Sequence, residues 1–143
     1  MDISIQEHAD KLAVVIHCES ADEYVLRLKD HIELFDHRLT VQHDGATVYM
    51  EAANVLYFES VDDRTFLYTD GAVMEIRLRL YELEDALAAH GFLRISKSVI
   101  INMHKISSLR PELNRTVLAT MCNGERLVIS RSYVKKLRSI LQV

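Results

Sequence analysis

The sequence predicts a mostly β protein made of packed antiparallel sheets, with one short internal helix and one C-terminal helix. The first observation behind this prediction is a set of two-residue turn signals, each flanked by short apolar runs. They are Asp44-Gly45, Asp70-Gly71 and Asn123-Gly124. Such pairs are the strongest short-range signal of a β-hairpin. The second observation is that strands and helices do not alternate in the regular way that builds a parallel sheet.

The turn signals and the apolar runs assign the expected strands. The paired segments are 39–43 with 46–50, 65–69 with 72–77, and 116–121 with 126–129. Short runs rich in aromatic and β-branched residues predict further strands. These lie at 55–60, 92–95, 99–101 and 106–110.

Two helices are expected among these strands. The first is short, carries Leu80, Leu83 and Leu87 on one face, and ends at Gly91, which suits a left-handed cap. Ser130 is placed to cap the second, C-terminal helix. The apolar face of that last helix carries Val134, Leu137 and Leu141.

Residues 1–38 are predicted to form a separate unit ahead of a main domain that spans residues 39–143. In this unit Ile3 and Ile5 alternate with polar neighbours, and residues 12–16 form a short apolar run. Both patterns favour strands. The expected order of the unit is therefore strand, strand and helix.

The helix of this N-terminal unit is predicted from its cap and from its apolar face. Ser20 and Glu23 have the spacing of a capping box. The apolar face that follows carries Val25, Leu28, Ile32 and Phe35. Such a helix buries one side only, so it packs either on its own domain or against a second copy or another partner. The sequence leaves both arrangements open.

Composition indicates a globular protein of the cytoplasm. The chain has 143 residues and contains no apolar run of about 18 residues, the length that a membrane span requires. Its N-terminus lacks the basic start and apolar stretch of a secretory signal. Cys18 and Cys122 lie far apart in the sequence, and we expect both to be reduced and buried.

Signatures of enzymes are missing from the sequence. It contains no phosphate-cradling glycine loop, no G-x-S-x-G and no C-x-x-C. The acidic pairs, such as Asp62-Asp63, are typical of solvated turns, and the histidines do not have metal-ligand spacing. We therefore expect no enzyme, no cofactor, no metal site and no small-molecule substrate. An active site assembled from residues distant in sequence is the alternative in this class.

Charge is distributed unevenly along the chain. The formal net charge is −4, yet residues 94–143 hold ten basic and two acidic side chains. A basic region on an acidic protein indicates a nucleic acid or an acidic partner. Serines accompany these basic residues, and this mixture suits contacts with phosphates and base edges. Two function classes follow: a DNA-binding protein, or a protein-interaction module whose basic face binds an acidic partner protein.

Three stretches of the chain favour the first class. They are residues 55–60 (VLYFES), 91–102 (GFLRISKSVIIN) and 123–133 (NGERLVISRSY). In this order, and with the short leucine-rich helix between the first two, they resemble the LytTR-type DNA-binding domain. The resemblance covers residues 39–143 and is specific because all three stretches occur together.

The resemblance implies a fold of three small antiparallel sheets and a transcription regulator of double-stranded DNA. Members of the family place loop residues, not a recognition helix, in successive major grooves at short direct repeats in promoters. The base-reaching positions fall on three loops. In this sequence they match Asp63, Arg64 and Thr65; Ser96 and Lys97; and Arg131 and Ser132, and we add Lys135 on the last helix as a DNA contact.

Other positions take structural roles in this comparison. Asn102 matches a family asparagine that holds a turn. Leu93 and Val99 stand where members of the family often carry aromatic residues, and we interpret them as substitutions within the core.

The resemblance also implies partners. Binding to direct repeats predicts two copies on one face of the DNA, and hence a homodimer. The chain resembles the small stand-alone members of the family, some of which are held by a membrane protein encoded beside them. Only about 37 residues precede the domain here, too few for a phosphorylated receiver domain, so we do not expect direct phosphorelay control.

Overall fold

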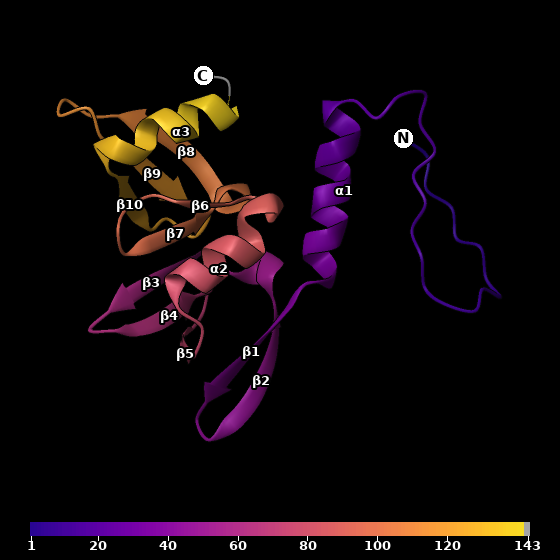
Figure 1. Ribbon diagram of the computed structural model, residues 1–143, viewed down its shortest axis with the longest axis horizontal. Coiled ribbons are helices and arrows are strands. Elements are labelled where there is room, and N and C mark those ends of the chain that lie inside the picture. Colours follow the sequence, from indigo (N-terminus) through magenta and orange to yellow (C-terminus); the bar gives the residue numbers. More distant parts are fainter. Residues whose placement is uncertain (142–143) are drawn as a thin grey trace.

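The computed structural model describes residues 1–141, and within the first helix the side chains of Arg27, Asp30, His31 and residues 33–36 lie outside that description. The elements follow one another as α1 (Glu23–Asp36), β1 (Arg38–His43), β2 (Ala46–Glu51), β3 (Tyr57–Val61), β4 (Arg64–Tyr68), β5 (Val73–Ile76), α2 (Leu80–Leu87), β6 (Phe92–Arg94), β7 (Val99–Asn102), β8 (Ile106–Pro111), β9 (Val117–Met121), β10 (Arg126–Ile129) and α3 (Arg131–Leu141) (Figure 1). The predicted mostly β fold, with a short internal helix and a C-terminal helix, is confirmed.

The strands form two antiparallel sheets. One has seven strands in the order β2-β1-β5-β4-β3-β7-β6, and the other has three in the order β10-β9-β8. The expectation of three sheets differs from this arrangement because β1 pairs with β5 through Gln42 and Glu75. That pairing joins the β1–β2 hairpin to the larger sheet.

Two hydrophobic cores lie on opposite faces of β7. Ile100 belongs to the core that α2 covers, and Ile101 belongs to the core shared with β9, β10 and α3. Successive residues of a strand point to opposite faces, so one buried strand serves both cores. Figure 1 shows α3 above β6 and β7 and α2 below them. Leu93 and Val99 are buried in the second core, as expected.

The predicted hairpins are all present, and the predicted cap at Gly91 is confirmed by its left-handed backbone, with φ 89°. A further tight turn joins β3 to β4. There Asp62 and Asp63 have φ values of 51° and 62°, and Val61 pairs with Arg64. Two consecutive left-handed residues fit a type I′ hairpin, and aspartate tolerates this conformation better than most residues.

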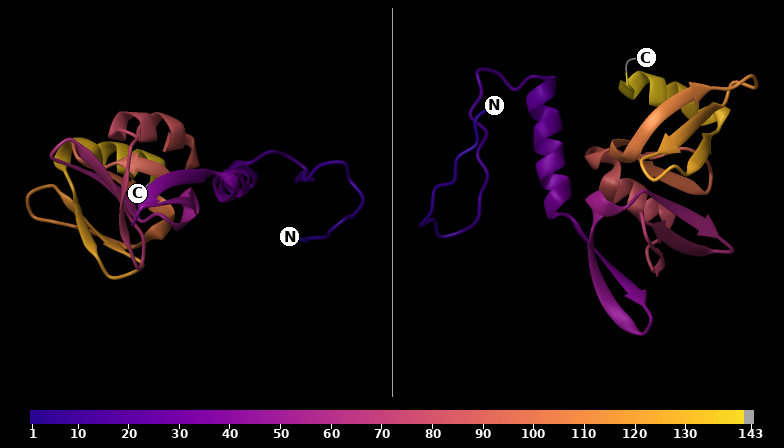
Figure 2. Two further views of the ribbon diagram at one scale, coloured as in Figure 1. Left: turned by 90° about the horizontal axis from the view of Figure 1, so that it is seen from below. Right: turned by 180° about the vertical axis from the view of Figure 1, so that it is seen from behind.

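The two strands predicted in the N-terminal unit are wrong. Residues 1–22 contain no strand, and Ile5 and Leu12 are 89% and 96% exposed. An apolar run becomes a strand only where another strand pairs with it, and within residues 1–141 no strand pairs with this segment. Figures 1 and 2 show it beside α1, away from the sheets.

The predicted helix of this unit is present, although its cap differs from the prediction. Asp22, not Ser20, caps α1, because its Oδ1 accepts a hydrogen bond from the Val25 amide at 3.0 Å. Val25, Leu28 and Ile32 are half-buried, and α1 contacts β2 and the 3₁₀ turn Ala88–His90. The fourth predicted residue of its apolar face, Phe35, has a side chain outside the described part.

Both cysteines are free, and both are exposed. The prediction that they are buried is wrong, because Cys18 lies in the segment without regular structure and Cys122 lies in the β9–β10 turn. Among residues 1–141, no helix has the length and apolar character needed to cross a membrane.

Candidate nucleic-acid interface

The short loop between β6 and β7 stands at the centre of the candidate interface. The Ile95 amide donates to the Val99 carbonyl at 3.0 Å, which closes the loop. Inside it the Ser98 amide donates to Ser96 Oγ at 3.2 Å. These bonds leave Lys97 exposed at the tip.

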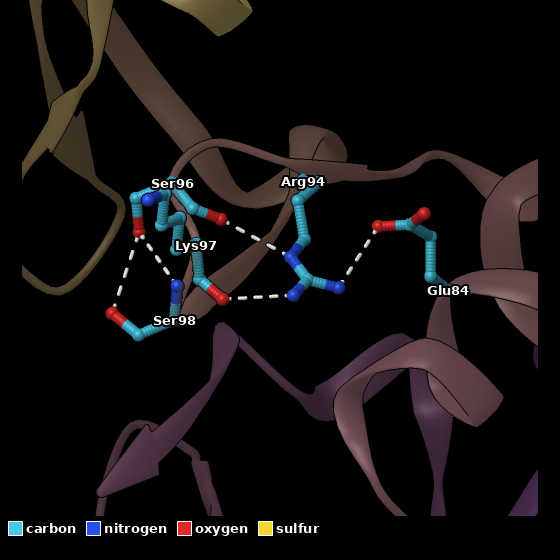
Figure 3. Close-up of polar contacts among 5 residues, drawn as sticks. All are labelled: Glu84, Arg94, Ser96, Lys97 and Ser98. Atoms are coloured by element: carbon cyan, nitrogen blue, oxygen red, sulfur yellow. Dashed lines mark hydrogen bonds and ion pairs between the residues drawn. The ribbon is translucent and has the colours of Figure 1, made fainter.

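Arg94 lies between this loop and Glu84 and contacts both, as Figure 3 shows. Its Nε donates to the Ser96 carbonyl at 3.1 Å, and its Nη2 donates to the Lys97 carbonyl at 2.8 Å. Its Nη1 pairs with Glu84 Oε2 of α2 at 3.1 Å, and the Arg94 side chain is only 22% exposed. Arg94 therefore fixes the shape of the loop and does not belong to the exposed basic surface.

Two other segments are hydrogen-bonded to the same loop. On one side the Ser60 amide of β3, close to the Asp62-Asp63 turn, donates to the Ser98 carbonyl at 2.8 Å. On the other side, just before α3, the amide and the hydroxyl of Ser130 both donate to the Ile95 carbonyl at 2.9 Å. The three loops predicted from the resemblance are thus brought side by side.

The predicted site residues differ in their exposure. Those exposed are Asp63, Arg64, Lys97, Arg131, Ser132 and Lys135, whereas Ser96 is half-buried. Thr65 is only 6% exposed, so its side chain does not reach the surface that its neighbours occupy. Arg64 lies 3.9 Å from Glu75 across β4 and β5, a long contact between two exposed side chains.

Comparison with known proteins agrees with this geometry. The family model of the LytTr DNA-binding domain matches residues 45–142, more than half of the chain. The chain belongs to the LytTR family. Proteins of this family are DNA-binding regulators and not enzymes. In addition, no group of three or more histidine, cysteine, aspartate or glutamate residues that could hold a metal ion occurs in the described part of the chain.

Individual relatives extend the LytTR comparison. The chain is 26% identical over 146 residues to an uncharacterised HTH-type transcriptional regulator of Staphylococcus aureus, covering 93% of this chain and 99% of that protein. It is 32% identical over 95 residues to the sensory transduction protein LytT of Enterococcus faecalis, of which it spans 39% of the length. A solved LytTr DNA-binding domain from Bacillus cereus superposes with a TM-score of 0.70 at 27% identity, covering 74% of this chain and 97% of that one.

Asn102 has the structural role in this LytTR domain that was expected of it. It is completely buried, and its Nδ2 donates to the Val55 carbonyl at 2.9 Å. Its Oδ1 accepts from the His104 amide at 3.1 Å and caps the 3₁₀ turn Met103–Lys105. Asn102 therefore joins the end of β7 to the segment before β3.

Two stacked tyrosines lie on the neighbouring strands β3 and β4. The rings of Tyr57 and Tyr68 are 4.2 Å apart and nearly parallel, and Tyr68 donates to Glu59 at 2.9 Å. Burial, and then the bond to Glu59, raises the pKa of Tyr68 to about 12. Burial and the nearby Glu125 also raise the pKa of Tyr57 above its usual range. Both phenols consequently stay protonated and neutral at ordinary pH.

The contacts that Arg94 makes with the loop and with Glu84 give a first prediction. Arg94→Lys keeps the charge but cannot reproduce the forked contacts of the guanidinium. We expect it to lower the free energy of unfolding by about 1 kcal/mol in urea denaturation. The control is Arg126→Lys, the same change at an exposed position of β10. Equal stability of the two variants would show that the forked contacts are unimportant.

Proposed function

We propose that this LytTR protein is a cytoplasmic regulator of transcription that recognises specific sequences in double-stranded DNA by inserting three loops into the major groove. One observation carries the proposal: exposed Arg64, Lys97 and Arg131 come from three segments joined by hydrogen bonds through Ile95 and Ser98. Cations held in fixed relative positions suit the reading of base edges, because discrimination between bases depends on geometry as well as charge.

The residue types match the chemistry of the groove. Lys97 and Arg131 are donors for the two acceptors that guanine presents in the major groove. Asp63 is an acceptor for the amino group of cytosine. Ser96, Ser132 and Lys135 supply hydroxyls and charge for phosphates and so set the register of the protein on the duplex.

Binding at direct repeats would place two copies on one face of the duplex. We propose that residues 1–38, as an extension ahead of the DNA-binding domain, serve contacts with the second copy or with a membrane-protein regulator encoded nearby. Tyr24 and Leu26 support this role because they are 64% and 50% exposed on α1. Apolar surface of this kind is typical of segments that contact another chain.

Salt dependence provides the test of duplex binding. If the basic region contacts about five to seven phosphates, log affinity should fall against log salt with a slope of roughly −4 to −6. Fluorescence anisotropy with a labelled duplex at several salt concentrations measures this slope. A flat salt response would exclude duplex binding. Tighter binding to polyglutamate than to every duplex tested would favour the alternative, a module that binds an acidic partner protein.

A further inference from the structure

A basic hollow lies beside the candidate interface, between α3 and the loop that joins β8 to β9. Its volume is about 760 Å³. Four basic side chains line it: Arg115 from the loop, and Arg131, Lys135 and Arg138 from α3. Arg115 and Arg138 belong to none of the three loops considered above.

The charge of this hollow is poorly compensated within the protein. Its one acidic residue is Glu112, and Glu112 is paired with Arg110 at 3.3 Å. Within residues 1–141, no carboxylate pairs with Arg115, Arg131, Lys135 or Arg138. Four like charges around one hollow repel one another and attract a polyanion.

The backbone of the loop presents Arg115 in a defined conformation. The Glu112 amide donates to the Thr116 carbonyl at 2.9 Å, and the Arg115 amide donates to the Glu112 carbonyl at 3.3 Å. Arg115 itself is left-handed, with φ 68°. The loop is thus a closed turn on the wall of the hollow.

The hollow continues the surface of the three loops. Arg131 belongs to both, because it begins α3 next to the Ser130–Ile95 bonds and also lines the hollow. From Arg131 to Arg138 the helix rises roughly 10 Å, which is about three phosphate spacings of one DNA strand along the duplex axis. The opposite side of α3 differs: Lys136, Ile140 and Leu141 line a second hollow that includes Phe92 and Leu93.

We propose that the basic hollow binds the phosphodiester backbone of the duplex immediately outside the bases that the three loops read. This inference rests on the proposed function and extends the contact surface to Arg115 and Arg138. These two residues supply affinity without sequence preference, because phosphate contacts carry no base information. The charge of the hollow and its continuity with Arg131 favour this occupant.

The test removes the two charges and varies the length of the duplex. In the double variant, Arg115→Asn suits the left-handed backbone and Arg138→Gln keeps a good helix former. Lys136→Gln is the matched control, since it lies on the same helix but lines the other hollow. Each protein is titrated with a duplex that ends at the preferred site and with one extended by about ten base pairs on each side.

On the extended duplex we expect the double variant to bind roughly tenfold more weakly, with a salt slope shallower by about 2. On the short duplex it should bind like the unchanged protein, and Lys136→Gln should affect both duplexes alike or neither. Unchanged affinity and slope on the extended duplex, or equal losses on both duplexes, would overturn the proposal. So would weaker binding to polyglutamate with DNA binding unchanged. The ratio of specific to random binding by the unchanged protein tests the proposed function separately.

Discussion

Lys97→Ala and Arg131→Ala should each weaken binding to the preferred duplex by about 1–3 kcal/mol, the usual loss for one base-reading side chain. Both side chains are exposed. Lys97 follows Ser96, whose carbonyl accepts from Arg94, and Arg131 follows Ser130, whose hydroxyl donates to the Ile95 carbonyl. Because neither side chain packs in a core, each variant should fold with a stability within about 0.5 kcal/mol of the unchanged protein. The loss is therefore one of recognition.

The measurement compares a preferred duplex with a random one at a single salt concentration. Base-reading residues lower affinity for the preferred duplex more than for the random one. Lys136→Ala, on the opposite side of α3 from the basic hollow, serves as the control and should affect both duplexes alike or neither. Equal losses on both duplexes would make Lys97 and Arg131 phosphate contacts. No loss on either would place the DNA-binding face elsewhere.

Asn102→Ala should lower the free energy of unfolding by about 2–4 kcal/mol, a large effect for one side chain. The substitution removes both side-chain bonds of a residue that is completely buried. The Val55 carbonyl then loses this partner in the interior, where water cannot readily replace it. The His104 amide loses the bond that caps the 3₁₀ turn. Urea denaturation followed by circular dichroism measures the change.

The matched control for this variant is Asn114→Ala. Asn114 also accepts a hydrogen bond, from the Thr116 hydroxyl at 2.6 Å. Unlike Asn102, however, it is exposed, in the β8–β9 loop. Its loss should cost no more than about 0.5 kcal/mol. If both variants lose the same free energy of unfolding, the burial of Asn102 does not explain its contribution to stability.

The elements that the sequence predicted correctly depend on local chemistry. Asp44-Gly45 specifies its hairpin because both turn residues adopt the required left-handed backbone, and in Asn123-Gly124 the glycine does so. The strands expected at Ile3, Ile5 and residues 12–16 are absent because a strand does not depend on local chemistry alone. Their alternation is local, but a strand needs a pairing partner, and the sequence pattern contains no information about that partner.

In the candidate site, too, some features follow from the sequence and others depend on contacts that form only on folding. Resemblance placed Lys97 and Arg131 on loops that the structure brings together. Arg94 begins the basic segment 94–143, but the sequence does not reveal its role in holding the loop, because its partners, Glu84 and two carbonyls of the next loop, meet it only after folding. The burial of Thr65 could have been predicted, since residues two apart in a strand share a face and Leu67 is in the core.

Sequence-specific recognition of double-stranded DNA by the three loops is the property on which the proposed function depends. Selection of bound sequences from a random duplex pool tests it most directly, with Lys97→Ala/Arg131→Ala selected in parallel. We predict that the unchanged protein enriches one short motif, present as a direct repeat, and that the double variant loses the preference at the positions its two side chains read. A pool that shows no enrichment, or an identical motif from both proteins, would contradict the account.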